Sequence, residues 1–371
     1  LPYLPSKTIT YEIARHGAAG SAIGTGVGVL TGLIFCFIIY RAYQPKVKIQ
    51  MKHDRTKYIE SYGNILKILL LTITPVIFST AIYNCSATID QTIFSNILVG
   101  KGITAKVVSG FYGLFSSQYN VLINVPVAMA SALSNAIVPN VSAAYALGKK
   151  DDMNDSIQMA IRFTMMIAIP CAVGFITLAK PILNMLYFTQ DNTTAALMLQ
   201  MGALSVVFFC LSTVTNSVLQ GLDDMMTPVK NAAISLVIHI VTLFLMLVVL
   251  KWNIYAVVLS KIIFSGAICV LNAKALRDRI GYVQEKKKTF VIPALASLIM
   301  GVIAVLVHLI FELFAGPYIA TIIALLAAVV TYGVAIVVLG GITEEELLGM
   351  PKGATLVTLC RRLHLIKGEY R

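Results

Sequence analysis

An uncharged stretch of 42 residues, Val107 to Gly148, limits what this chain can fold into more than any other feature. The stretch contains no Asp, Glu, Lys, Arg or His, which indicates a segment buried in a membrane. One membrane crossing needs about 20 residues at roughly 1.5 Å of rise each, so one straight helix does not account for it. Pro126 and Pro139 divide the stretch. We expect a polar-faced crossing, a proline kink and a short helix that ends at Lys149.

The composition of the whole chain agrees with a membrane protein. Of 371 residues, 58% are hydrophobic and 12% are charged, and the mean hydropathy is +0.83. Soluble domains do not combine so little charge with so much apolar surface. A net charge of +12 would suggest nucleic acid as the partner of a soluble chain. In a membrane protein, the distribution of positive charge among the loops indicates the orientation of the chain in the membrane. We therefore expect membrane lipids and no nucleic acid as partners.

Apolar segments of crossing length recur along the chain and predict an all-α polytopic membrane protein with nine crossings. They are Ala18–Tyr40, Ile65–Ile89, one crossing within Val107–Gly148, Ile157–Ala179, Ala195–Gln220, Val229–Leu250, Ile254–Ala273, Phe290–Leu313 and Tyr318–Leu339. Placing the 41–62 loop in the cytoplasm puts 21 Lys and Arg residues on that side and 6 on the other. Because positive charge concentrates in cytoplasmic loops, we expect a cytoplasmic C-terminus.

Three segments resemble a known family of transporters. The run YNVLINVPVAMASALSNAIVPNVSAAYALGKKDD (Tyr119–Asp152) looks like the eighth crossing and following loop of the polysaccharide transporter family. The segment SVLQGLDDMMTPVKN (Ser217–Asn231) is similar to its junction between the tenth and eleventh crossings, and residues 343–366 resemble its cytoplasmic end. That family includes the stage V sporulation protein B group and belongs to the MATE-like flippase superfamily, with lipid II flippases and multidrug-extrusion (MATE) antiporters.

The resemblance implies a MATE-like flippase fold, in which two six-helix lobes are followed by two extra helices. The chain would then be a fragment that lacks roughly the first five transmembrane helices, and the missing first lobe would be its partner. We expect the last helix of the first lobe and a basic cytoplasmic linker at 1–63, and the second six-helix lobe at 64–280. The two additional helices fall at 281–342, and the cytoplasmic tail at 343–371.

The function that the resemblance implies is that of a flippase in the bacterial cytoplasmic membrane. It would move lipid-linked oligosaccharide or polysaccharide precursors by alternating access, for cell-wall, spore-cortex or surface-polysaccharide assembly. A MATE-type cation-coupled drug or metabolite antiporter is an alternative. A glycan polymerase or ligase is less favoured because the outer loops are short. No catalytic or nucleotide-binding motif appears, so we expect no enzyme and no cofactor, with possible sodium or proton coupling. The sequence does not indicate an oligomeric state.

Polar residues within the crossings are the candidates for a substrate cavity, because polar groups at bilayer depth face protein or a watery space. Gln118, Asn120 and Asn124 share one helical side approximately. They border a cavity that hydrogen-bonds sugars or pyrophosphate, or they join neighbouring helices. Lys261 faces the cavity, or extends outward to the headgroups. Asn84 completes the candidate set. The cavity arginine of the lipid II branch is absent, since the aligned position is Val121.

A sodium site is implied by resemblance to the lipid II flippase branch. Its matching positions are Asp90, Gln220 and Asp224, whose oxygen atoms suit a hard monovalent cation. Two plainer interpretations stay open: Asp90 reaches the membrane interface, and Asp224 belongs to an ordinary cytoplasmic loop. His239 lies alone in an apolar crossing, where we expect a buried neutral side chain.

Overall fold

The computed structural model describes residues 6–53, 60–188, 191–344, 346 and 353–362, and all regular structure in these residues is helical. Contacts divide the chain into two units, Leu1–Ile68 and Leu69–Arg371. The first unit holds α1 (Ser6–His53) and the start of α2 (Tyr62–Gly100). The apolar side chains of α1, among them Ile23, Leu30 and Phe35, are exposed, as expected for a helix that faces lipid.

The second unit is a helical bundle that follows on from α2. Its elements are α3 (Ala105–Leu114), the π-helix η1 (Phe115–Tyr119), α4 (Asn120–Ala146), α5 (Lys150–Thr177), α6 (Ala179–Leu186), α7 (Thr193–Gly221), α8 (Met226–Val248), α9 (Asn253–Ile280), the π-helix η2 (Lys287–Val291), α10 (Ile292–Val338) and α12 (Gly353–Arg362).

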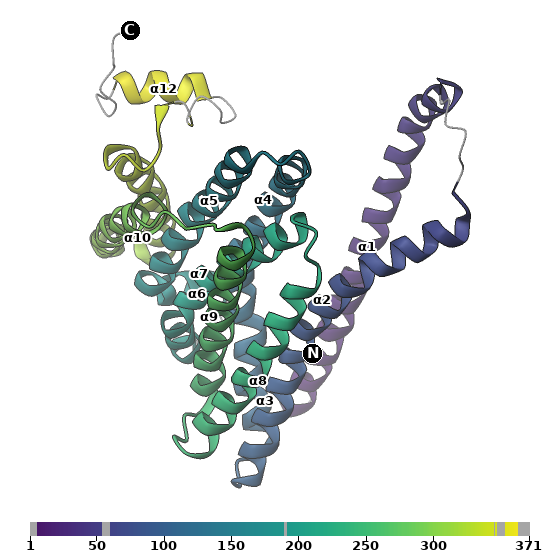
Figure 1. The fold of residues 1–371 in the computed structure, drawn as a ribbon. Coiled ribbons are helices and arrows are strands. Elements are labelled where there is room, and N and C mark those ends of the chain that lie inside the picture. Colours follow the sequence, from purple (N-terminus) through teal and green to yellow (C-terminus); the bar gives the residue numbers. More distant parts are fainter. Residues whose placement is uncertain (1–5, 54–59, 189–190, 345, 347–352, 363–371) are drawn as a thin grey trace. The chain divides into compact units, whose positions relative to one another are not determined.

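Helix α7 lies at the centre of this bundle, against α4, α5 and α9 (Figure 1). Helix α9 in turn packs on α8, and α10 packs on α5. Small residues on α7 allow its neighbours to approach closely. At Gly202 an added Cβ atom would overlap the ring and hydroxyl of Tyr119, which is 2% exposed and lies 3.1 Å from Ser205 Oγ. Gly202 therefore sets where Tyr119 sits.

The proline-divided stretch forms one helical segment, which corrects the prediction. Helix α4 continues through both Pro126 and Pro139 to Ala146, and no separate short helix follows Pro139. The irregularity lies earlier, where the wider turn of η1 joins α3 to α4. Each proline lacks one N–H donor, but the neighbouring helices α5 and α7 pack along α4 and hold it in place.

Helix α10 is a hairpin of two helices that meet at Gly316. Gly316 has φ 79° and ψ 165°, a conformation open essentially only to glycine. His308 and Thr321 are 13 residues apart, which is about 20 Å along a straight helix. Their side chains nevertheless form a 3.2 Å hydrogen bond, so the halves 292–315 and 317–338 fold back on each other. They correspond to the predicted pair Phe290–Leu313 and Tyr318–Leu339.

Eight helical segments in the described residues are long and apolar enough to cross a membrane, which confirms a polytopic all-α membrane protein. The sequence predicts nine crossings. The difference arises because the last segment, Lys287–Val338, runs through the α10 hairpin and contains two crossing-length halves.

The contact of Gly202 with Tyr119 leads to a prediction on stability. We expect Gly202→Ala to lower the free energy of unfolding by about 1–3 kcal/mol, because the added methyl group displaces the Tyr119 ring. Gly174→Ala is the matched control, since a Cβ atom there meets nothing within 4 Å. It should be neutral or slightly stabilising. Thermal unfolding in detergent measures both variants, and equal unfolding temperatures would contradict the packing argument.

Candidate substrate cavity and its ion cluster

Three ionisable side chains from three helices meet inside the second unit, and we call Asp90, His239 and Lys261 the ion cluster. Asp90 of α2 is 0% exposed, and its two oxygens have different partners. The Lys261 ammonium of α9 lies 2.8 Å from Oδ2, and His239 Nε2 of α8 lies 2.5 Å from Oδ1. A carboxylate removed from water is tolerated only when such partners compensate it. These contacts explain how α2 can carry Asp90 into the bundle.

The surrounding hydrogen bonds define the charge of the ion cluster. His239 Nδ1 lies 3.0 Å from the carbonyl oxygen of Ser260, which only accepts, so Nδ1 carries a hydrogen. The contact between Nε2 and Asp90 then needs a second proton, either on the imidazole ring or on the carboxyl group. Lys261 also donates to Ser86 Oγ at 2.7 Å. With an ammonium on Lys261, both arrangements give the cluster one net positive charge.

A cavity of about 280 Å³ lies beside the ion cluster, and Lys261 is the one cluster residue in its wall. The wall combines polar and aromatic groups. Its polar side chains are Lys261, Ser86, Asn120, Asn124 and Thr213, and its aromatic side chains are Phe115, Tyr119, Phe209 and Phe264. Such a mixture of apolar walls with a few convergent polar groups is typical of a small-molecule site.

Local structure explains how the cavity amides converge. Asn120 and Asn124 are four residues apart on α4 and therefore lie on one face. They follow directly after η1, and Tyr119 at the end of η1 is fixed by its contact with Gly202. Phe264 lies three residues after Lys261 on α9, and the Lys261 ammonium is 5.7 Å from the centre of its ring. The cavity wall thus depends on α4, α7 and α9 together.

The structure separates the predicted cavity residues into two groups. Asn120, Asn124 and Lys261 line the cavity. Gln118 does not: it is 1% exposed and donates to Asn192 Oδ1 at 3.3 Å, so the interhelical interpretation holds for this amide. Asn84 is exposed on α2 and is absent from the cavity wall, because the side chains that reach the cavity from this helix are further along, at Ser86 and Ala87.

The three residues of the expected sodium site do not come together. Asp224 receives hydrogen bonds from the backbone N–H and side chain of Thr227 and pairs with Arg279 at 2.7 Å, while Asp90 pairs with Lys261. Lys261 and Arg279 are 18 positions apart on α9, which is about 27 Å along the helix axis. Gln220 ends α7 on the Asp224 side. Asp224 therefore lies in the loop just before α8 and accepts hydrogen bonds from its first turn, in agreement with the ordinary-loop interpretation.

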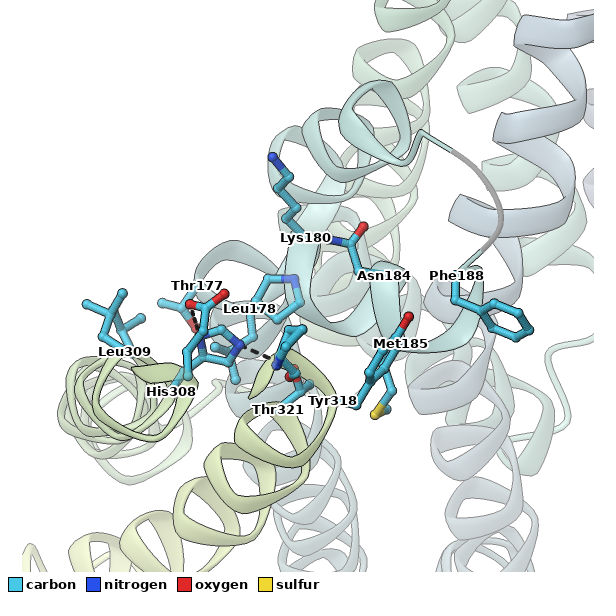
Figure 2. Close-up of a pocket in the computed structure, with 14 residues that line it drawn as sticks. Thr177, Leu178, Lys180, Asn184, Met185, Phe188, His308, Leu309, Tyr318 and Thr321 are labelled. Atoms are coloured by element: carbon cyan, nitrogen blue, oxygen red, sulfur yellow. Dashed lines mark hydrogen bonds and ion pairs between the residues drawn. The ribbon is translucent and has the colours of Figure 1, made fainter. Parts of the chain in front are cut away.

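A second pocket, of about 620 Å³, lies between α5, α6 and the α10 hairpin (Figure 2). Its wall is mostly apolar, with Leu178, Met185 and Leu309 among its residues. His308 lies in the wall, with Nε2 3.2 Å from Thr321 Oγ1 and Nδ1 3.6 Å from Glu312. This pocket contains none of the predicted site residues.

Sequence reasoning missed the partners of Asp90. His239 was expected to be a neutral packing residue, and an outward-pointing Lys261 was an open alternative, yet both contact the same carboxylate. A signal was available: Asp90, His239 and Lys261 each lie in or directly beside a different crossing, and a buried charge requires a partner. Ser86 and Thr213 gave no such signal, because serine and threonine are common in membrane helices.

The family comparison agrees with this architecture. A family profile described as "Lipid II flippase MurJ" matches residues 8–330, most of the chain. The chain belongs to the MurJ family. Membership of the MurJ family confirms the MATE-like flippase superfamily that the resemblance implied, and it supports a transporter in place of an enzyme. The match does not reach the narrower polysaccharide transporter or stage V sporulation protein B group.

Two relatives come from Bacillus subtilis (strain 168). "Lipid II flippase MurJ" is 22% identical over 250 residues, covering 64% of this chain and 44% of that protein. "Uncharacterized membrane protein YabM" is 23% identical over 368 residues, covering 95% of this chain and 67% of that protein. A solved structure of lipid II flippase MurJ, in an inward closed conformation, has the same fold, with a TM-score of 0.53 and 18% identity. The match covers 57% of the solved MurJ chain. This chain therefore spans about half the length of the MurJ proteins that it matches.

The ion cluster in this MurJ-family chain leads to a prediction on stability. We expect Lys261→Met to lower the free energy of unfolding by about 3–5 kcal/mol, because Asp90 keeps its burial and loses its ammonium partner. The double variant Asp90→Asn with Lys261→Met should recover most of the loss, since no unpaired charge remains. Chemical unfolding of both variants in micelles measures the difference. Equal losses in the single and double variants would contradict this account of the pair.

Proposed function

We propose that the protein carries a lipid-linked glycan precursor across the bacterial cytoplasmic membrane by alternating access. The observation behind this proposal is the mixed wall of the cavity beside the ion cluster. Amides such as Asn120 and Asn124 can hydrogen-bond sugar hydroxyls, and the rings of Phe209 and Phe264 offer flat apolar surfaces to a sugar ring. The net positive charge beside them favours the phosphate that joins a glycan to its lipid.

The size of the cavity supports a cargo that enters by its headgroup. At about 280 Å³ it is just below the usual range of roughly 300–1,000 Å³ for small-molecule sites. It therefore suits one sugar-sized group, while a lipid tail stays outside. The larger pocket beside the α10 hairpin, with its apolar wall, is our candidate for tail contact. Lipid II is the cargo named for the relatives. The missing cavity arginine, replaced by Val121, leads us to propose a different glycan for this chain.

We further propose that the glycan is an oligosaccharide or polysaccharide precursor for cell-wall, spore-cortex or surface-polysaccharide assembly. The support is the resemblance of Tyr119–Asp152 to the polysaccharide transporter and stage V sporulation protein B group. In this proposal 64–280 is the second lobe, 281–342 adds the two extra helices, and 1–63 belongs with a first lobe. The tail at 343–371 lies in the cytoplasm, in line with the excess of positive charge on that side.

The proposal predicts the effect of the cavity amides on transport. With the whole protein in liposomes and a fluorescent lipid-linked oligosaccharide as cargo, we expect Asn120→Ala or Asn124→Ala to slow flipping about 3–10-fold. The reason is the loss of roughly 0.5–1.5 kcal/mol per hydrogen bond to the headgroup. Asn64→Ala, at an exposed position near the start of α2, is the matched control and should flip like the wild type.

The same liposomes distinguish a glycan flippase from the main alternative, a drug or metabolite antiporter. If the wild type exports a lipophilic cationic dye and flips no lipid-linked glycan, the protein is a drug or metabolite antiporter. If both asparagine variants flip at the wild-type rate, the cavity has no role in cargo binding, and the proposal loses the observation on which it rests.

A further inference from the structure

Asp90 is the carboxylate at which resemblance implies a bound sodium ion, so the fit of that ion can be tested on the surrounding oxygen atoms. A hard cation needs several oxygen ligands with free lone pairs. Three oxygen atoms around the ion cluster each already accept one hydrogen bond. Ser86 Oγ accepts from Lys261, and the carbonyl oxygens of Ala87 and Ser260 accept from Tyr112 and His239 at 2.8 and 3.0 Å.

The position of Lys261 also leaves no room for a second cation. Its ammonium lies 2.8 Å from Asp90 Oδ2, and His239 Nε2 lies 2.5 Å from Oδ1, so both carboxylate oxygens already have a partner. A further cation at Asp90 would lie directly against the Lys261 ammonium and would be repelled by it. Asp90 itself has no surface on the cavity, whereas Lys261 does, so Lys261 lies between the cavity and the carboxylate.

We propose that the Lys261 side chain replaces the coupling cation at Asp90, so that this carboxylate binds no sodium. The ammonium is a monovalent cation attached to α9, and it cannot be exchanged with the solution. The structure therefore disagrees with the sodium site that the resemblance implies for this position. The inference concerns the ion and not the cargo, and it stands whether or not the protein flips a glycan.

Sodium-dependent stability tests this directly. In detergent, the wild type should unfold at the same temperature in sodium chloride and in choline chloride, and it should show no Asp90-dependent binding of ²²Na⁺. A sodium effect that is retained in Asp90→Asn belongs to another site and agrees with the proposal. A sodium effect in the wild type that Asp90→Asn abolishes would overturn it.

Removing the lysine side chain should create sodium binding at Asp90, which is the complementary test. Lys261→Ala leaves Asp90 with space and without its ammonium, so sodium should now raise the unfolding temperature by about 2–4 °C at saturating salt. Potassium chloride at the same ionic strength controls for general screening. The added substitution Asp90→Asn should remove the gain. If folded Lys261→Ala shows no gain, Lys261 does not occupy a cation site and the proposal is wrong.

The test gives a result even if one variant or one assay fails. If Lys261→Ala does not fold, the comparison of wild type with Asp90→Asn still decides whether sodium binds at Asp90. Failure of the flipping assay leaves these binding measurements unaffected, so the two proposals are tested separately.

Discussion

The ion pair between Asp90 and Lys261 is the interaction on which the described site depends, because it can form in one arrangement of the helices only. Each residue along a helix turns the next side chain by about 100°. A one-residue rotation of α9 would therefore carry Lys261 away from α2 and leave the Asp90 carboxylate without its ammonium partner at 0% exposure. His239 adds the same constraint for α8. Buried ion pairs add little to stability, but they can select one register among several apolar ones.

Apolar packing then holds the cavity wall in place. Lipid and helix surfaces are equally apolar, so close contact between helices comes from small residues and from polar pairs. Gly202 lets Tyr119 approach α7, and Tyr119 ends the π-helix from which Asn120 and Asn124 continue. The charge in the cavity wall comes from Lys261 on α9, its serine from α2 and its amides from α4. The site is thus assembled from segments far apart in the sequence.

Much of the fold could be predicted from the sequence, but the partners of the buried charges could not. Apolar runs of crossing length indicate the helices and even the two halves of α10, because each run reflects burial in lipid. The depth of a residue in the membrane does not show how its helix is rotated or which helices lie beside it. Asp90 and His239 are 149 positions apart, so the sequence gives no direct sign that they are in contact. The same limit explains why Gln118 was grouped with Asn120, and why Asp224 was assigned to one site with Asp90, although their partners Arg279 and Lys261 lie 18 positions apart on α9. The two prolines also gave a wrong prediction of a separate short helix, since α4 continues through both of them.

The wide turn at Phe115–Tyr119 has a consequence for how this segment tolerates change in length. A π-helix holds one residue more than an α-helical turn and costs energy to maintain. Loss of one residue there would relax the backbone into an ordinary turn, so the chain could absorb the shortening without breaking. Because the wide turn fits its extra residue into about one turn, the helix before the deletion would keep its orientation relative to Asn120 and Asn124. The change would stay local to the side chains of η1, among them Phe115 in the cavity wall, while α3 and α4 would keep their positions.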